Sequence, residues 1–276
     1  MNRQNHNKLR LGALSLILIL SLIACTSTET PNEATQTQGQ LPPTTMEATP
    51  VEETEANDFT IVDEDGKTDI DTDALAEELP HQTDSSELSD LEIQGLLFMR
   101  EEEKLARDVY LTLGEMWNMN IFENIARSEQ THTDAIKVLL DQFGLEDPMA
   151  TDEVGVFENE KLQTMYDDLV AAGSQSLIEA LKVGAAIEEI DIIDLEEYSV
   201  QTDNADIQLV YANLTKGSRN HLRSFVSVLE KQSGESYQPQ YLTQEAFNTI
   251  INSAMENSGN GRGNSGGNGH GNGGNN

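Results

Sequence analysis

Residues 87–257 carry apolar side chains at helical spacing over nearly their whole length, with no convincing alternation of period two. This pattern restricts the segment to an all-α fold. The first helix is expected to begin at Ser89 and Glu92, whose side chains can satisfy each other's backbone donors as a capping box. The pattern predicts a four-helix bundle with a short crossover helix and a C-terminal helix. The expected long helices are 89–117, 120–143, 176–198 and 206–231, the crossover helix is 160–172, and the last helix starts at 243.

The core-facing seam of each long helix is interrupted near its middle by residues that are rarely buried. These residues are Glu103 on the first helix, Glu129 and His132 on the second, Glu188 and Asp191 on the third, and His221 on the fourth. Burying uncompensated ions costs several kcal/mol each, and few basic residues share these seams. Helical bundles hold two iron or manganese ions between such carboxylates and histidines. The spacing therefore predicts a metal site in the bundle interior.

Helical spacing alone leaves two of these choices open. Glu102 fits a seam with Phe98 and Val109 almost as well as Glu103 fits its own. On the third helix, Glu189 competes with Glu188 in the same way. Glutamate and aspartate are also common on helices, so a chance arrangement on all four helices is a further alternative.

The N-terminus has the layout of a secretory signal. Arg3, Lys8 and Arg10 precede an unbroken run of apolar and weakly polar residues from 11 to 24. This run is short for a membrane span. The run ends at Cys25, the only cysteine, in a sequence that resembles the bacterial lipobox. We expect residues 1–24 to be a signal peptide, a covalent lipid on Cys25, and an extracytoplasmic protein anchored to the cell envelope membrane. The sequence leaves open whether the anchor lies in the inner or the outer membrane.

The segments on either side of the helical region differ from it in composition. Residues 25–87 are rich in Thr, Glu, Asp, Gln and Pro, and they predict an acidic disordered tether. A run of aspartates from Asp63 resembles a calcium loop. However, Ile61 and Thr72 occupy the first and twelfth positions, where such a loop needs carboxylate ligands. Residues 257–276, rich in Gly and Asn, predict a disordered tail, which leaves 88–256 as the folded bundle. The net charge of −33 excludes nucleic acid as a partner and favours metal cations.

Four stretches carry a resemblance to a known superfamily. LLFMREEEKLARDVY, NIARSEQTH, GAAIEEIDI and GSRNHLRSF resemble the ferritin-like superfamily over about residues 88–250, and more closely its domain of unknown function 2202. Compared with rubrerythrins, the likeness implies that Glu103, rather than Glu102, is a ligand. It implies the same role for the other five seam residues. The fourth helix departs from the pattern, because Ser218 stands where the bridging glutamate is expected. This departure leaves open whether the site binds two metal ions, one or none.

The resemblance implies a membrane-tethered bundle that binds a carboxylate-bridged iron or manganese centre. Iron oxidation, or reduction of oxygen or peroxide, is the expected chemistry, so the enzyme classes considered are a di-metal oxidase and a peroxidase. Tyr110 is either a phenol that serves this site or an ordinary core tyrosine. The chain has no rubredoxin-like cysteine pair, so its electron donor is unknown, and a homodimer is one assembly left open.

The alternative function is a non-catalytic ferritin-like scaffold that acts as an envelope interaction lipoprotein. Ser218 favours this interpretation. It predicts that the seam carboxylates pair with Arg107, Arg219 or Arg223 and that the protein is metal-free. A calcium-binding lipoprotein is a third and weaker hypothesis.

Overall fold

The structure, a computed structural model, describes residues 58–63, 66–79, 88–149 and 151–257. The expected signal peptide, Cys25, the first part of the expected tether and the tail from residue 258 lie outside the described residues. Within the described part, no helix combines the length and apolar character needed to cross a bilayer.

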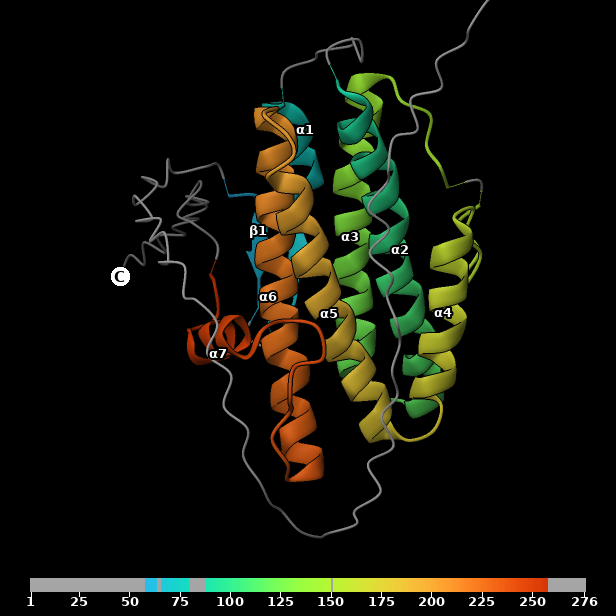
Figure 1. The fold of residues 1–276 in the computed structure, drawn as a ribbon, viewed down its shortest axis with the longest axis vertical. Coiled ribbons are helices and arrows are strands. Elements are labelled where there is room, and N and C mark those ends of the chain that lie inside the picture. The colour runs from blue at the N-terminus through green and yellow to red at the C-terminus, as the bar shows by residue number, and fades with distance from the viewer. Residues whose placement is uncertain (1–57, 64–65, 80–87, 150, 258–276) are drawn as a thin grey trace, which may run out of the picture. The chain divides into compact units, whose positions relative to one another are not determined.

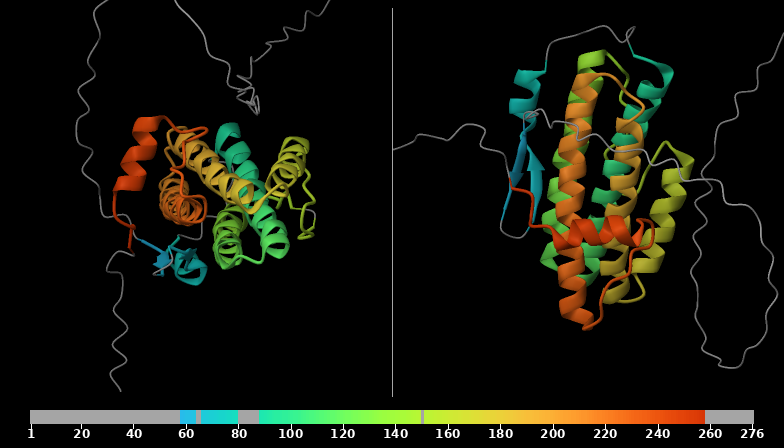
Figure 2. Two further views of the ribbon diagram at one scale, coloured as in Figure 1. Left: turned by 90° about the horizontal axis from the view of Figure 1, so that it is seen from below. Right: turned by 60° about the vertical axis from the view of Figure 1, so that its left-hand side comes forward.

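Four long helices form the bundle, as the sequence predicted (Figure 1). They are α2 (Asp90–Trp117), α3 (Asn120–Phe143), α5 (Leu177–Ser199) and α6 (Ala205–Ser233). α2 packs along α3 and α5 along α6, while α2 also contacts α5 and α3 contacts α6. Figure 2 shows these helices end-on around a common interior. The all-α class is confirmed.

Local signals set the ends of these helices. The amide of Ser89 donates to Glu92 Oε2 at 2.7 Å and the amide of Glu92 donates to Ser89 Oγ at 3.3 Å, which completes the capping box. Asn118 ends α2 in the left-handed conformation with φ of 50°, and Gly144 ends α3 with φ of 65°. Both helices therefore end at the residues predicted from sequence, 117 and 143.

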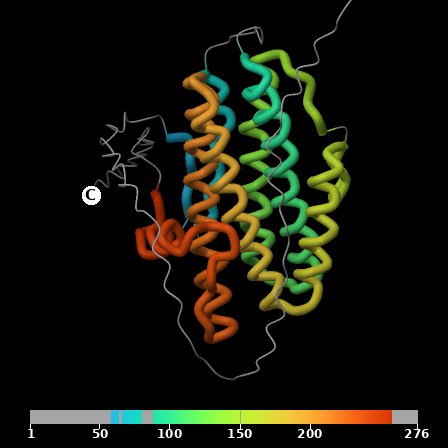
Figure 3. The backbone as a smooth tube through the Cα atoms, in the orientation of Figure 1, coloured from blue at the N-terminus to red at the C-terminus, as the bar shows by residue number. Residues whose placement is uncertain are grey.

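Two smaller helices extend the bundle. α4 (Glu160–Gly173) crosses between α3 and α5 and packs against α2 and α5. α7 (Gln244–Asn252) packs against α6 near the end of the described chain. The tube in Figure 3 traces the long connection that leads into α4. The crossover and C-terminal helices were both predicted from sequence.

The prediction of a disordered tether is wrong for residues 58–63 and 66–79. They form a hairpin of β1 (Thr60–Val62) and β2 (Thr68–Ile70), followed by α1 (Thr72–Glu78). The hairpin packs on α3 and α6, and α1 packs on α3. The physical reason is local: a few apolar side chains in this acidic stretch, including Ile70 and Leu75, are buried against the bundle. The stretch that resembles a calcium loop falls within this hairpin and the start of α1: Asp69 lies in β2, and the side chain of Asp71 caps α1.

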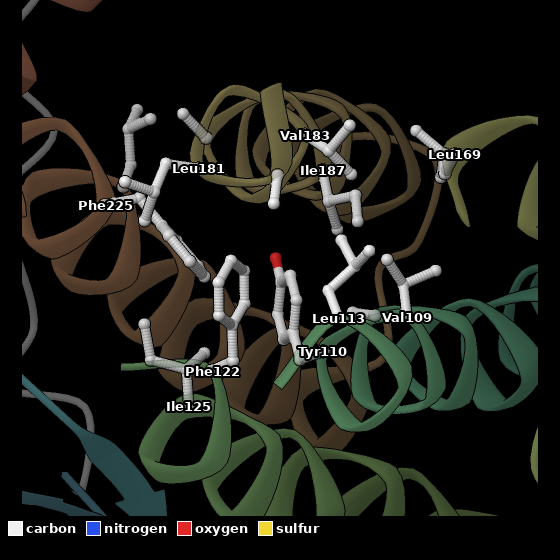
Figure 4. Close-up of a cluster of buried hydrophobic side chains, with 14 of the residues drawn as sticks. Val109, Tyr110, Leu113, Phe122, Ile125, Leu169, Leu181, Val183, Ile187 and Phe225 are labelled. Atoms are coloured by element: carbon white, nitrogen blue, oxygen red, sulfur yellow. The ribbon is translucent and has the colours of Figure 1, made fainter. Parts of the chain in front are cut away.

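The apolar core is divided into two clusters by a polar layer. One cluster surrounds Tyr110, Phe122 and Phe225, whose rings pack in tilted pairs (Figure 4). The other surrounds Met99 and Tyr211 towards the opposite end of the bundle. Each helix therefore buries apolar side chains on both sides of its polar mid-section.

We predict that Glu92→Gln lowers the free energy of unfolding by about 1 kcal/mol at pH 7. Burial acts to raise the pKa of Glu92, but hydrogen bonds from Thr202 and Ser89 outweigh it and lower the pKa. A depressed pKa stabilises the fold at neutral pH, and this contribution is lost as the pH falls through the folded-state pKa. Denaturant titrations should therefore show that the difference from the parent shrinks below about pH 4.

The matched control is Glu179→Gln in α5. Glu179 also lies three residues after an N-cap serine, but its side chain pairs with Lys182 at a half-exposed site. We expect this change to cost less than about 0.5 kcal/mol. Equal losses of unfolding free energy in the two variants would show that the buried capping box stabilises the fold no more than the half-exposed pair does.

Candidate metal centre

All six seam residues predicted from sequence meet in one buried layer, which we call the polar layer. Its members are at most 4% exposed: Glu103 of α2, Glu129 and His132 of α3, Glu188 and Asp191 of α5, and His221 of α6. They meet because each helix places them on its inward stripe, halfway along its length. The Glu-x-x-His spacing puts a carboxylate and an imidazole of α3 on the same face.

Glu129 lies between the two histidines. Its Oε2 is 2.9 Å from His132 Nδ1, and its Oε1 is 2.8 Å from His221 Nδ1. Glu103 Oε2 lies 3.4 Å from His132 Nδ1, and Glu188 Oε2 lies 3.6 Å from His221 Nδ1. The two imidazole rings stack with centroids 5.3 Å apart. Each histidine thus faces the shared carboxylate of Glu129 and one further glutamate.

Three of these residues meet the geometric requirement for a metal site by themselves. Glu129, His132 and His221 each offer a ligand atom, and these atoms lie within 4.8 Å of one another. Carboxylate oxygen and imidazole nitrogen are ligands for iron, manganese and zinc. This group could therefore hold a metal ion.

Two hydroxyl groups border the polar layer. Tyr110 donates to Glu188 Oε1 at 2.6 Å, so its phenol contacts the site directly. Figure 4 shows its hydroxyl pointing towards α5. Ser218, which stands where a glutamate was expected, donates a hydrogen bond to Asp191 Oδ2. The serine therefore supports the aspartate, and it brings no charge of its own.

Buried polar atoms without a well-formed hydrogen bond concentrate in this layer. The atoms that lack a well-formed hydrogen bond include both carboxylate oxygens of Glu103, Glu129 Oε1, Asp191 Oδ1, and Nδ1 of His132 and His221. Such groups cost free energy unless a partner compensates them. Among the described residues, no lysine or arginine forms an ion pair with these carboxylates. Protons or a metal cation are the remaining partners.

Burial and mutual repulsion shift the pKa values of the carboxylates upward. Burial raises the pKa of Glu103 and of Glu188 to about 7, and it raises that of Asp191 well above its usual range. Burial also acts to raise the pKa of Glu129, but attraction to His132 and His221 outweighs it and lowers the pKa. The protein alone thus keeps one carboxylate ionised and disfavours ionisation of the others.

The shifts of the two histidines complete this electrostatic pattern. Burial alone would lower the pKa of His221, but Glu129 and Glu188 outweigh it and raise the pKa to about 9. The pKa of His132 is raised well above its usual value, again against the effect of burial, by Glu129 and Glu103. Positive charge at the two Nδ1 atoms is therefore favoured, as a proton or as a metal ion.

The structure places Glu103 and Glu188, rather than their neighbours, beside the histidines. Glu102 shares a hydrogen bond with Asp194, and the carboxylates in contact with the histidines are those of Glu103, Glu129 and Glu188 instead. Glu189 turns to the opposite side of α5 and accepts from Tyr237 Oη at 2.6 Å. It also accepts from the backbone amides of residues 240–242, at 2.7 Å for residue 241. Glu189 thus anchors the segment before α7.

The arginines considered as alternative partners bind other groups. Arg107 pairs with Asp108 and Asp152. Arg219 and Arg223 both pair with Glu256. The pairing that a metal-free scaffold predicts for the polar layer is therefore not what the structure shows.

Two residues at the histidines were missed by the sequence analysis. Thr68 of β2 accepts from His132 Nε2 through its carbonyl oxygen at 2.9 Å, and Ser128 Oγ lies 3.2 Å from His221 Nε2. Thr68 belongs to the segment expected to be disordered, and Ser128 lies off the apolar seam of α3. No helical spacing signal could have found either residue.

Comparison with known proteins gives a consistent family assignment. The family described as "Uncharacterized protein domain (DUF2202)" matches residues 92–254. The chain belongs to this family. The DUF2202 resemblance drawn from the four sequence stretches is thus confirmed, and the hairpin precedes the matched residues.

One archaeal relative is similar in both sequence and structure. The chain is 53% identical over 169 residues to the uncharacterized protein MJ0754 of Methanocaldococcus jannaschii, covering 61% of this chain and 91% of the relative. The crystal structure of hypothetical protein MJ0754 from Methanococcus jannaschii superposes with a TM-score of 0.62 at 52% identity. That match covers 65% of this chain and 99% of the other. The similarity therefore extends over nearly the whole of that archaeal protein.

We predict that the two neighbouring glutamates of α5 differ in their effect on stability. Glu189→Ala should lower the free energy of unfolding by about 2 to 4 kcal/mol, because it leaves buried donors without an acceptor. Glu188→Gln should not lower it in chelator-treated protein, because it removes a carboxylate that repels Glu129. Urea unfolding of the two variants measures the contrast, and a larger loss for Glu188→Gln would contradict this assignment.

Proposed function

We propose that this protein is a ferritin-like bundle that binds a dinuclear iron or manganese centre in the polar layer. The observation that carries the proposal is the position of Glu129, which presents one oxygen to the Nδ1 atom of each histidine. A carboxylate placed in this way can bridge two metal ions. The pattern of orphaned, buried ligand atoms supports the same assignment.

The ligand set divides into two halves that share Glu129. His132 and Glu103 would hold one ion, and His221 and Glu188 the other. Asp191, whose pKa responds to Glu103, Glu129 and Glu188, would supply the carboxylate that the fourth helix lacks at Ser218. Two ions of charge +2 would offset the four carboxylates, which supports two metals rather than one.

The proposed chemistry is iron oxidation, or the reduction of oxygen or peroxide. A pair of iron or manganese ions supplies the electrons and the Lewis acidity for such reactions. The chain's own contribution is to hold the ligands in a dry interior and to orient Glu188 through the hydroxyl of Tyr110. The phenol lies close enough to the ligands to exchange a proton with Glu188.

The proposed location is outside the cytoplasm, tethered by a lipid on Cys25. The charged start, the apolar run and the single cysteine of the sequence support this location. An electron donor would then have to reach the protein at the envelope, and a homodimer is compatible with the proposal.

We predict that the full chain, supplied with iron or manganese, carries about two metal equivalents. Glu129→Ala should lose nearly all bound metal, because it removes an oxygen from each half of the site. The same change at Glu123, an exposed residue of α3, is the control and should retain the parent content. Elemental analysis gives the stoichiometry. Metal-free parent protein that melts at the same temperature with and without added iron or manganese would refute the proposal.

A second candidate is a non-catalytic scaffold, which Ser218 favours because one bridging glutamate is absent. We predict that iron-loaded parent protein oxidises ferrous iron or consumes peroxide faster than Glu129→Ala. Optical assays of ferric product and of residual peroxide measure these rates. Bound metal with no turnover above that of the variant, in either assay, would favour the scaffold over the oxidase or peroxidase.

A further inference from the structure

The hairpin presents backbone groups of β2 to the bundle. In an antiparallel pair, alternate facing residues exchange backbone hydrogen bonds and the intervening residues turn theirs outward. Here the amide of Asp63 donates to Lys67, and that of Asp71 donates to Phe59. Thr68 lies between these bonded positions and faces Val62. The N–H and C=O groups of Thr68 therefore point away from β1.

These outward groups meet side chains of the metal-site helix α3. The carbonyl oxygen of Thr68 lies 2.9 Å from His132 Nε2, and its amide donates to Ser128 Oγ at 3.0 Å. The next outward amide, that of Ile70, donates to Thr131 Oγ1 at 2.8 Å. β2 thus pairs its free edge with the helix that carries Glu129 and His132.

The contact with His132 determines where that imidazole carries its proton. A carbonyl oxygen can only accept, so Nε2 must be the protonated nitrogen. In the neutral ring the lone pair is then on Nδ1, which faces Glu103 and Glu129. This is the nitrogen that a metal between these carboxylates would use.

Ser128 transmits the contact to the second histidine. Its hydroxyl oxygen accepts from the amide of Thr68 at 3.0 Å and lies 3.2 Å from His221 Nε2. The amide of Thr68 also lies 3.3 Å from His221 Nε2, while Nδ1 of that ring faces Glu129 and Glu188. One residue of the hairpin therefore serves both halves of the polar layer.

The hairpin is held in this position by its own contacts. Thr68 is fully buried, and its Oγ1 accepts from Asn220 Nδ2 at 3.0 Å, one residue before His221. Gly66 adopts a φ of +84° in the turn, where an added Cβ would collide with Ser224 of α6. The contact between Thr68 and the histidines is thus part of a packed interface.

We infer that the backbone of Thr68 is a positioning element for the metal-binding histidines, supplied by a hairpin outside the DUF2202 match. Its carbonyl oxygen contacts His132, and its amide contacts His221 both directly and through Ser128. Its effect on metal binding rests on the proposed function, whereas its effect on the proton of His132 does not. Thr68 of this hairpin is therefore part of the site.

The test compares Thr68→Pro and Ser128→Ala in the full chain with Val62→Pro, the facing position of β1. Proline at 68 removes the amide but no ladder bond, and Ser128→Ala removes the hydroxyl between Thr68 and His221 while it leaves the hairpin sequence intact. We expect the dissociation constant for Mn²⁺ to rise roughly 10- to 100-fold in both, as for other partners of ligating histidines. Val62→Pro should stay within about threefold of the parent. Equal weakening by Val62→Pro, or no weakening by Ser128→Ala, would overturn the inference.

Nitrogen-15 NMR of the chelator-treated proteins provides a readout that does not depend on metal. In the parent, the Nε2 proton of His132 should exchange slowly with solvent. Ser128→Ala should shift the ring nitrogen signals of His221 and leave the His132 proton protected. A parent that binds no Mn²⁺ but shows this pattern would refute the proposed function and retain the inference. Fast exchange of the His132 Nε2 proton in the parent would overturn the inference.

Discussion

Four carboxylates and two imidazoles share one buried layer, and much of the structure is arranged around the cost of this burial. Each ion loses hydration worth several kcal/mol when it leaves water. Compensation must come from within the layer, because the nearby arginines are committed elsewhere: Arg107 to Asp108 and Arg219 to Glu256. The apolar clusters on both sides exclude water and strengthen every interaction between these charges.

Close packing lets the layer form between helices. An added Cβ at Gly217 of α6 would lie 2.6 Å from His132 Nε2, so only glycine there leaves room for the ring. Glu189, one residue beyond Glu188, ties the segment before α7 to the outer side of α5. α5 thus uses adjacent glutamates for opposite purposes, one inside the site and one in the scaffold around it.

The hairpin changes what the site consists of. The family match begins at residue 92, yet a strand that ends at Ile70 supplies a hydrogen-bond partner to His132. In metalloproteins, a hydrogen-bond acceptor at the ring nitrogen that does not bind the metal orients the histidine and raises its basicity. The candidate ligands therefore come from the family domain, whereas one of their hydrogen-bond partners comes from the hairpin that precedes it.

Much of the bundle was predictable because its signals are local. The capping box at Ser89, the glycine at 144 and the 3.6-residue period depend on neighbours a few positions apart, and they located the ends of α2 and α3. The same period brought six polar residues to the inward stripes. It could not separate Glu188 from Glu189, because α5 is buried on most of its circumference.

The sequence by itself determined the all-α class, the helix ends and the set of residues that meet inside the bundle, because each depends on periodicity along one helix. Periodicity left open which glutamate of each neighbouring pair faces the histidines, since that depends on helix rotation against three partners. The family resemblance implied Glu103 and Glu188, and the tertiary structure places both beside the histidines. It alone revealed the role of Thr68, because a contact between a three-residue strand and a helix some 60 residues later in the chain leaves no periodic trace in the sequence.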